Sequence, residues 1–146
     1  MWAIARRASQ LPTDVLTQIA QPLSNWILRL AVPLQKEPRK LFEALYSALL
    51  SALREHPEAT ASGLVSSGAI DWANHALNSP IGNLAQALMK DESLESSAGG
   101  LPSSWLRKAE SLLDLTGDAR RDALVIFSSQ LAWIYGHAAL GPKPIF

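Results

Sequence analysis

The sequence predicts an all-α fold of about six helices. Apolar residues recur at the i, i+3, i+4 spacing of amphipathic helices along most of the 146-residue chain. No segment alternates convincingly between apolar and polar residues, and the β-prone stretch 124–127 lies inside a helical pattern. Short connections favour antiparallel packing of consecutive helices. The periodicity leaves open whether these hairpins close into a bundle or stack like helical repeats.

The first predicted helix covers residues 13–31, where the apolar stripe is continuous. Thr13 and Asp14 are candidate caps at its start. Pro22 lies inside the pattern and removes one backbone hydrogen bond, so a kink or a break is expected near Gln21. The stripe stays in phase across Pro22, which favours a kink.

The second predicted helix opens at Pro38, because proline suits the first helical position, and ends where His56 precedes Pro57. Residues 58–68 are rich in alanine, serine, threonine and glycine, which is typical of a loop. A short helix is expected over residues 69–77.

At the next boundary one predicted helix ends and another begins at once. Ser79 can cap a new helix and Pro80 can take its first position, and the apolar pattern continues to Leu88. Residues 91–100 have no apolar pattern and include Gly99 and Gly100, which predicts a flexible linker inside a single domain of residues 1–146.

Two helices are expected after the linker. One starts at residues 101–103 and carries Trp105 on its apolar stripe. Gly117 is expected to adopt a left-handed conformation after this helix, and Asp118 to cap the last helix. Gly136 and the pair Gly141–Pro142 are expected to close that helix.

Composition excludes several classes of protein. The 13 basic and 13 acidic residues give a formal net charge of zero, which argues against a nucleic-acid-binding module. The absence of cysteine excludes disulfides, thiolate zinc sites and cysteine nucleophiles. Residues 123–142 carry no charge, but polar residues interrupt them, so a core helix is favoured over a membrane span. The N-terminus has no secretory signal, which favours a cytoplasmic protein.

Motifs that carry chemistry are scarce. The chain has no glycine-rich phosphate loop and no G-x-S-x-G turn, so neither a cofactor nor a nucleophile elbow is predicted. Asp71 and His75 lie four residues apart and could begin a metal site or an acid–base pair. Helix-end hydrogen bonding or a surface pair is the favoured interpretation. The favoured interpretation of Arg120 and Arg121 is that they lie in solvent at the start of a helix.

The last predicted helix is apolar on more than one side. Val125, Ile126 and Trp133 broaden it beyond one stripe, and such a helix is normally covered on more than one side. Val125, Ile126, Trp133 and Ile134 are therefore the candidate interaction residues. We expect an exposed apolar patch that includes part of this helix, with the side chains of these residues and Phe127 exposed. Self-association or contact with other protein chains would cover the patch.

Residues 71–88 and 101–126 resemble recurring segments of large bacterial sirtuin-like proteins. In that family an N-terminal NAD-degrading domain precedes a long helical region, and several members act in anti-phage defence. The resemblance implies that this chain is a fragment or truncated product lacking the sirtuin-like domain, because none of its residues match that domain.

Three functional hypotheses follow. The first is a non-catalytic scaffold, oligomerisation or sensing segment of such a defence protein, with the rest of the parent protein as partner. The second is a free-standing helical protein-interaction module that binds a partner helix in a groove. The third is a small enzyme that uses Asp71 and His75.

Overall fold

The computed structural model describes residues 2–36, 39–60, 71–90 and 100–138. These residues form helices and contain no strand, which confirms the all-α prediction. The elements are α1 (Trp2–Ser9), α2 (Thr13–Gln18), α3 (Ala20–Lys36), α4 (Arg39–Glu55), the 3₁₀ helix η1 (Pro57–Thr60), α5 (Trp72–Leu77), α6 (Pro80–Met89), α7 (Ser103–Leu113), α8 (Gly117–Ser129) and α9 (Leu131–Ala138).

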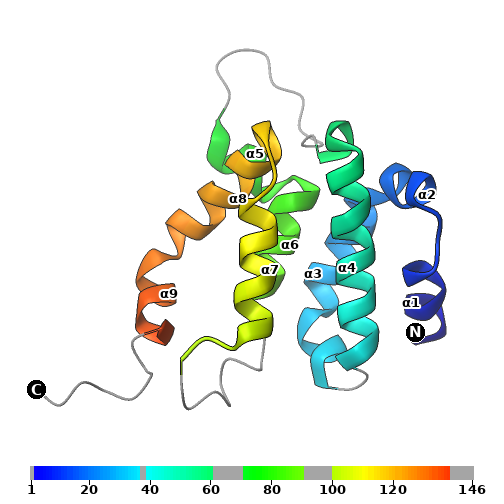
Figure 1. The fold of residues 1–146 in the computed structure, drawn as a ribbon, viewed down its shortest axis with the longest axis horizontal. Coiled ribbons are helices and arrows are strands. Elements are labelled where there is room, and N and C mark those ends of the chain that lie inside the picture. The colour runs from blue at the N-terminus through cyan, green and yellow to red at the C-terminus, as the bar shows by residue number, and fades with distance from the viewer. Residues whose placement is uncertain (1, 37–38, 61–70, 91–99, 139–146) are drawn as a thin grey trace, which may run out of the picture.

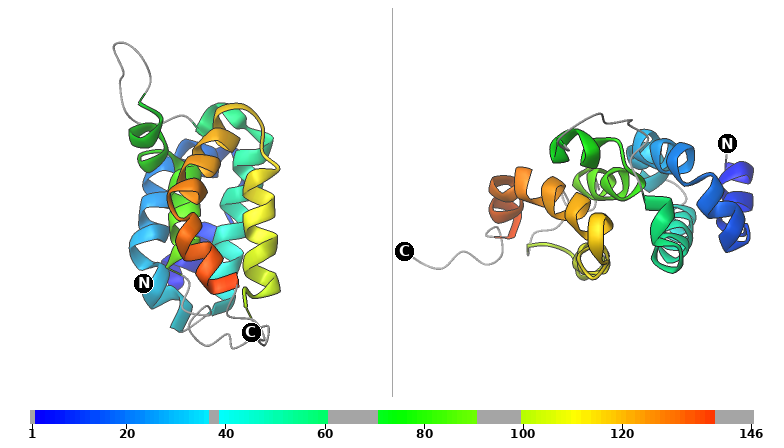
Figure 2. Two further views of the ribbon diagram at one scale, coloured as in Figure 1. Left: turned by 90° about the vertical axis from the view of Figure 1, so that its left-hand side faces the viewer. Right: turned by 90° about the horizontal axis from the view of Figure 1, so that it is seen from above.

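The helices form an elongated stack of hairpins. α3 and α6 run in one direction and α4 and α7 run in the other, as expected for short antiparallel connections (Figure 1). From above, the helices follow one another from α1 at one end to α9 at the other (Figure 2). The arrangement is therefore closer to a helical-repeat stack than to a closed bundle.

α6 is the central helix of this stack, packed against α3, α5, α7 and α8. Nearly all of its side chains are buried. Hydrogen bonds add to the apolar contacts: the Tyr46 hydroxyl of α4 donates to the Leu84 carbonyl at 3.1 Å, and Trp105 Nε1 of α7 donates to the Leu88 carbonyl at 2.9 Å. The buried Asn83 amide donates to two polar side chains of α3, each at 3.0 Å. Because buried polar groups are costly when unpaired, these bonds help to fix α3, α4 and α7 around α6.

The restart between α5 and α6 follows the prediction closely. Ser79 Oγ accepts a hydrogen bond from the Gly82 amide at 2.9 Å, and Pro80 is the first residue of α6. A Cβ atom built on Gly82 would lie 1.6 Å from the Ala76 carbonyl oxygen. Only glycine therefore lets α6 start this close to the end of α5.

The helix predicted over residues 13–31 is in fact two helices. α2 ends at Gln18 and α3 begins at Ala20, with Ile19 between them at φ −108° and ψ 15°. The favoured kink is wrong and the alternative, a break near Gln21, is confirmed: Pro22 lies in the first turn of α3, where its missing N–H breaks no helical bond. The expected caps are also wrong: the N-cap residue of α2 is Pro12, without a side-chain cap hydrogen bond.

The last predicted helix also divides in two. α8 ends at Ser129 and α9 begins at Leu131. Gly117 has φ +60°, which confirms its left-handed conformation. Asp118 is not the cap, because α8 already begins at Gly117 and its N-cap residue is Thr116, without a side-chain hydrogen bond.

Other predicted boundaries are confirmed or lie outside the described residues. α4 ends before His56 and Pro57 as expected, although residues 57–60 form η1 and not a loop. α5 begins at Trp72, and residues 69–70 lie outside the described part of the chain, as do Pro38 and the linker apart from Gly100. Within the described ranges, no helix combines the length and the apolar character needed to cross a membrane.

Candidate interaction surface

α9 lies at one end of the stack, where it continues the chain from the end of α8 (Figures 1 and 2). Two of its large apolar side chains are open to solvent: Leu131 is 62% exposed and Tyr135 is 76% exposed. Ala132 and Gly136 are exposed beside them, whereas Ile134 is half-buried against the core. α9 thus has an inner side toward the protein and an outer apolar side made of residues 131, 132, 135 and 136, which we call the outer face of α9.

The predicted interaction residues do not form this face. Ile126 and Phe127 are buried in the chain's own core, so the expectation that they are exposed is wrong. Val125 and Ile134 are half-buried against the core, and the Trp133 side chain lies outside the described residues. Their burial has a physical cause: α8 packs on α6, and α6 covers one side of the broad apolar surface of α8.

No lysine, arginine, aspartate or glutamate occurs between Ala123 and Ala138, and the four residues of the outer face of α9 carry no ionised side chain at neutral pH. At the opposite end of the stack, α1 exposes Ile4, which is 66% exposed. There, however, the exposed Arg6 and Arg7 lie close by in the same helix. The two ends of the stack therefore differ in electrostatic character although both expose apolar side chains.

A shallow hollow of about 210 Å³ lies between α5, α6 and α8 and reaches the junction of α8 with α9. Its apolar lining includes Leu77, Met89 and Ile126, and Gln130 of the junction lies at its edge. Leu77 is 49% exposed, so apolar surface is not confined to α9 at this end of the molecule.

Asp71 and His75 do not pair with each other, which corrects the catalytic pair considered from sequence. Asp71 is the N-cap of α5, and its Oδ1 accepts from the amides of Ala73 and Asn74 at 3.1 and 3.2 Å. His75 Nδ1 instead lies 2.6 Å from Oδ1 of Asp122 on α8. Helix-end hydrogen bonding, the favoured interpretation of Asp71, is confirmed.

Asp122 is fully buried, and its Oδ2 has no hydrogen-bond partner. Burial raises the pKa of this carboxyl group, and the negative charge of Asp118 adds to the rise. The hydrogen bond and electrostatic interaction with His75, together with the Ser79 hydroxyl, lower this pKa. The carboxylate can orient the imidazole through Nδ1, which leaves Nε2 as the other nitrogen available for chemistry.

Trp72 completes the contact between α5 and α8. Its ring centroid lies 5.1 Å from that of His75, and the Arg121 guanidinium carbon lies 4.2 Å from the Trp72 centroid. Arg121 thus stacks on an aromatic ring, a cation–π contact, and is not simply solvated as the sequence suggested. In the described part of the chain, no group of three histidine, aspartate or glutamate side chains could hold a metal ion.

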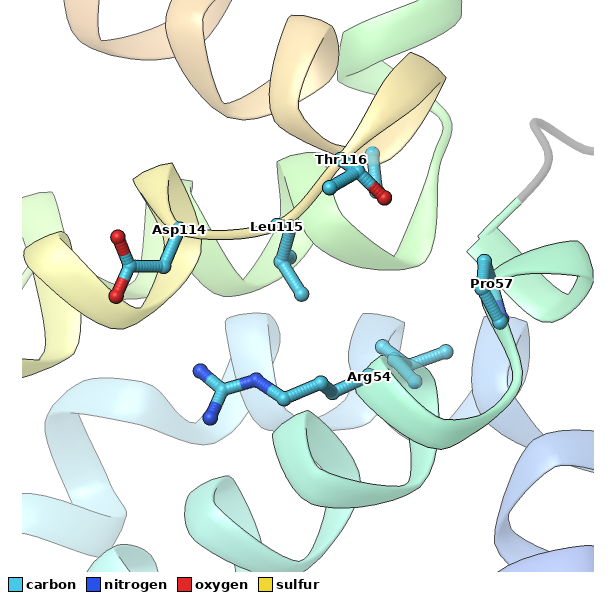
Figure 3. Close-up of a pocket in the computed structure, with 7 residues that line it drawn as sticks. Arg54, Pro57, Asp114, Leu115 and Thr116 are labelled. Atoms are coloured by element: carbon cyan, nitrogen blue, oxygen red, sulfur yellow. The ribbon is translucent and has the colours of Figure 1, made fainter.

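Side chains also bridge α4 and α7. Lys108 is buried, and its Nζ lies 2.6 and 2.7 Å from the two carboxylate oxygens of Glu43. Arg54 donates to the Ser111 carbonyl at 3.3 Å. Near Arg54 a hollow of about 240 Å³ lies beside the turn from α7 to α8 (Figure 3). The Arg54 guanidinium lies on the Asp114 side of this hollow, away from Pro57 (Figure 3).

Comparison of the chain with protein-family models, with curated proteins and with solved structures found no match. The choice of functional site therefore depends on the geometry. Among the surfaces described, the outer face of α9 combines large exposed apolar side chains with the absence of charge. Neither the lining of the α5–α6–α8 hollow nor that of the hollow beside Arg54 includes His75 or Asp122.

Proposed function

We propose that this chain is a non-catalytic helical interaction segment that binds protein through the outer face of α9. The observation that carries the proposal is the exposure of Leu131 and Tyr135 on α9, at one end of the stack. Burial of a large apolar side chain contributes about 1.5–3 kcal/mol, so two such anchors can supply a substantial share of a binding energy. Exposed apolar patches on soluble proteins commonly mark interaction sites.

The chemistry of the surface indicates the kind of partner. A partner must offer an apolar, uncharged surface, because a charge placed against residues 131–136 would be desolvated without an opposite charge to pair with. Such a partner is another helix or helical hairpin that continues the stack beyond α9. In helical-repeat proteins, terminal repeats need a polar outer side for solubility, which α9 does not provide.

Two observations support a structural role for Asp71 and His75, the residues of the enzyme hypothesis. Asp71 is engaged in capping α5, and His75 is held between Trp72 and Asp122 at the contact of α5 with α8. This arrangement ties two helices together, which is a structural task. A role as scaffold, oligomerisation or sensing segment is consistent with these contacts.

We also propose a sirtuin-like anti-phage defence protein as the parent of this segment. The support for this parent is the resemblance of residues 71–88 and 101–126 described above. A reading frame for a sirtuin-like domain immediately upstream of the gene would support the proposal. An upstream region without such a reading frame would contradict it.

The experiment that tests the role of α9 is affinity capture with a tagged chain in the cells that express it. Leu131→Glu places a charge on the outer face, and Ile4→Glu is the matched control, since Ile4 is exposed to a similar extent on α1. We expect the same protein to be captured by the wild type and the control but not by Leu131→Glu. Equal capture by all three proteins would refute the role of α9.

A further inference from the structure

We propose that α5 is a clasp that is closed on α8 while the buried Asp122 carboxyl group is protonated and that opens when this group becomes charged. The change is local, because the rest of the stack keeps its fold when α5 opens. This inference does not depend on the role of α9, since it concerns the contact between α5 and α8.

α5 buries much less of its surface than the neighbouring α6. Ala76 is the one buried residue among the six of α5, and Leu77 is 49% exposed. In α6, eight of the ten residues are buried. A segment with few buried apolar contacts opens at a lower free energy than the whole protein unfolds. α5 can therefore leave α8 without global unfolding.

Two contacts between side chains hold α5 on α8. His75 Nδ1 lies 2.6 Å from Asp122 Oδ1, and the Arg121 guanidinium carbon lies 4.2 Å from the centroid of the Trp72 ring. Both contacts involve groups that carry or can carry a charge. Their strength therefore depends on protonation, whereas the burial of apolar side chains does not.

The end of α5 that leads into α6 is fixed more firmly. Ser79 Oγ donates a hydrogen bond to the Ala76 carbonyl at 3.1 Å and accepts one from the Gly82 amide at 2.9 Å. Because these bonds join the last turn of α5 to the first turn of α6, opening begins at the first turn of α5, which carries Trp72 and His75.

The charge of Asp122 decides between the closed and the open state. Asp122 is fully buried in the closed state, and its Oδ2 has no hydrogen-bond partner. A carboxylate there loses its water without full compensation, whereas in the open state water can solvate both oxygens. Burial accordingly raises the pKa of Asp122 in the closed state above its ordinary value.

The direction of the response follows from this raised pKa. The closed state binds the Asp122 proton more tightly than the open state, so acid favours closing. This advantage is complete below the ordinary carboxyl value of about 3.9 and is lost as the pH rises through the raised value. α5 is therefore expected to open more often near neutral pH than in acid.

Neighbouring groups tune this response. The negative charge of Asp118 on α8 adds to the rise in the pKa of Asp122, while His75 of α5 and the Ser79 hydroxyl at the start of α6 oppose it. α6 itself carries no ionisable residue, and the charged residues of α7 do not contribute. Arg121 of α8 stacks on α5 instead. Burial is the largest influence, so the net effect is a rise.

Hydrogen exchange of the full chain, followed by NMR, tests the clasp. The amides of residues 75–78 report on α5, and those of residues 84–88 report on α6. After correction for the intrinsic exchange rate, we expect α5 to be at least about tenfold less protected than α6, and to exchange at a rate that low urea concentrations leave unchanged. The protection of α5 should fall by about threefold or more between about pH 4 and about pH 7.

Two variants and a control identify the groups responsible. Asp122→Asn removes the titrating group, so the protection of α5 should no longer depend on pH. Arg121→Gln loses the contact with Trp72 and should lower the protection of α5 by a similar factor at every pH. Asp114→Asn, which removes an exposed carboxylate at the end of α7, is the matched control and should behave as the wild type.

Equal protection of α5 and α6 would overturn local opening. Protection of α5 that does not change with pH, or a pH dependence that survives in Asp122→Asn, would overturn the role of Asp122. Should Asp122→Asn fail to fold, the pH profile of the wild type and the effect of Arg121→Gln still decide whether the clasp exists.

Discussion

The buried carboxylate of Asp122 predicts opposite effects for two substitutions at the same position. Asp122→Asn keeps an oxygen that can accept a hydrogen bond from His75 Nδ1 and removes the charge, so the cost of burying a charge disappears. We expect its free energy of unfolding near neutral pH to equal or exceed that of the wild type. Asp122→Ala removes the acceptor and leaves His75 Nδ1 without this partner, which should cost about 1–3 kcal/mol.

The raised pKa of Asp122 also fixes the direction in which stability changes with pH. Because burial raises the pKa of Asp122, the folded protein binds this proton more tightly than the unfolded chain. The stability of the wild type should therefore fall as the pH rises from the unfolded carboxyl value of about 3.9 through the raised folded value. Asp122→Asn has no proton to lose, so its advantage over the wild type should grow across this window and level off above it.

Urea unfolding followed by circular dichroism, between about pH 4 and about pH 7, measures both effects. His75→Ala and the double variant complete a cycle that isolates the coupling between the two side chains, for which we expect about 0.5–3 kcal/mol. An Asp122→Asn variant as unstable as Asp122→Ala, with the same pH dependence as the wild type, would refute the reasoning.

Three further substitutions test the local backbone. Gly82→Ala should cost about 3 kcal/mol or more in urea unfolding, because its Cβ would lie 1.6 Å from the Ala76 carbonyl oxygen; a loss below about 1 kcal/mol would contradict this contact. Gly136→Ala is the matched control, since its Cβ enters open space in a helix, and it should stabilise the chain by up to about 1 kcal/mol. Gly117→Val should cost about 1–2 kcal/mol at φ +60°, whereas Asp118→Ala should change stability by less than about 0.5 kcal/mol because Asp118 is not the cap. The reverse order of these last two effects would show that the turn is misassigned.

Local signals predicted much of the helical architecture. The Ser79–Pro80 restart, the end of α4 before His56 and the left-handed Gly117 are all confirmed. Each depends on residues within about one helical turn, so the sequence alone contains the necessary information. The sequence analysis did not predict α1, because its eight residues are too few to show a clear helical repeat of apolar residues.

Breaks within helices were harder to place. Ile19 separates α2 from α3, and Gln130 separates α8 from α9, although the apolar pattern continues through both. Pro22 marks the first break, because it cannot donate a hydrogen bond to the carbonyl of Gln18, where α2 ends. No glycine or proline marks the second break.

The candidate interaction surface separates most clearly what the sequence shows by itself from what the tertiary structure decides. Sequence alone showed that the last helical region is apolar on several sides and lacks charge, because these are properties of composition and periodicity. Tertiary structure decided which of its residues remain exposed: α6 covers Ile126, while Leu131 and Tyr135 stay open to solvent. It also gave His75 the partner Asp122, 47 residues away, in place of Asp71. The physical reason is that capping and periodicity act within a few residues, whereas burial and buried pairing depend on helices that meet only in the folded chain.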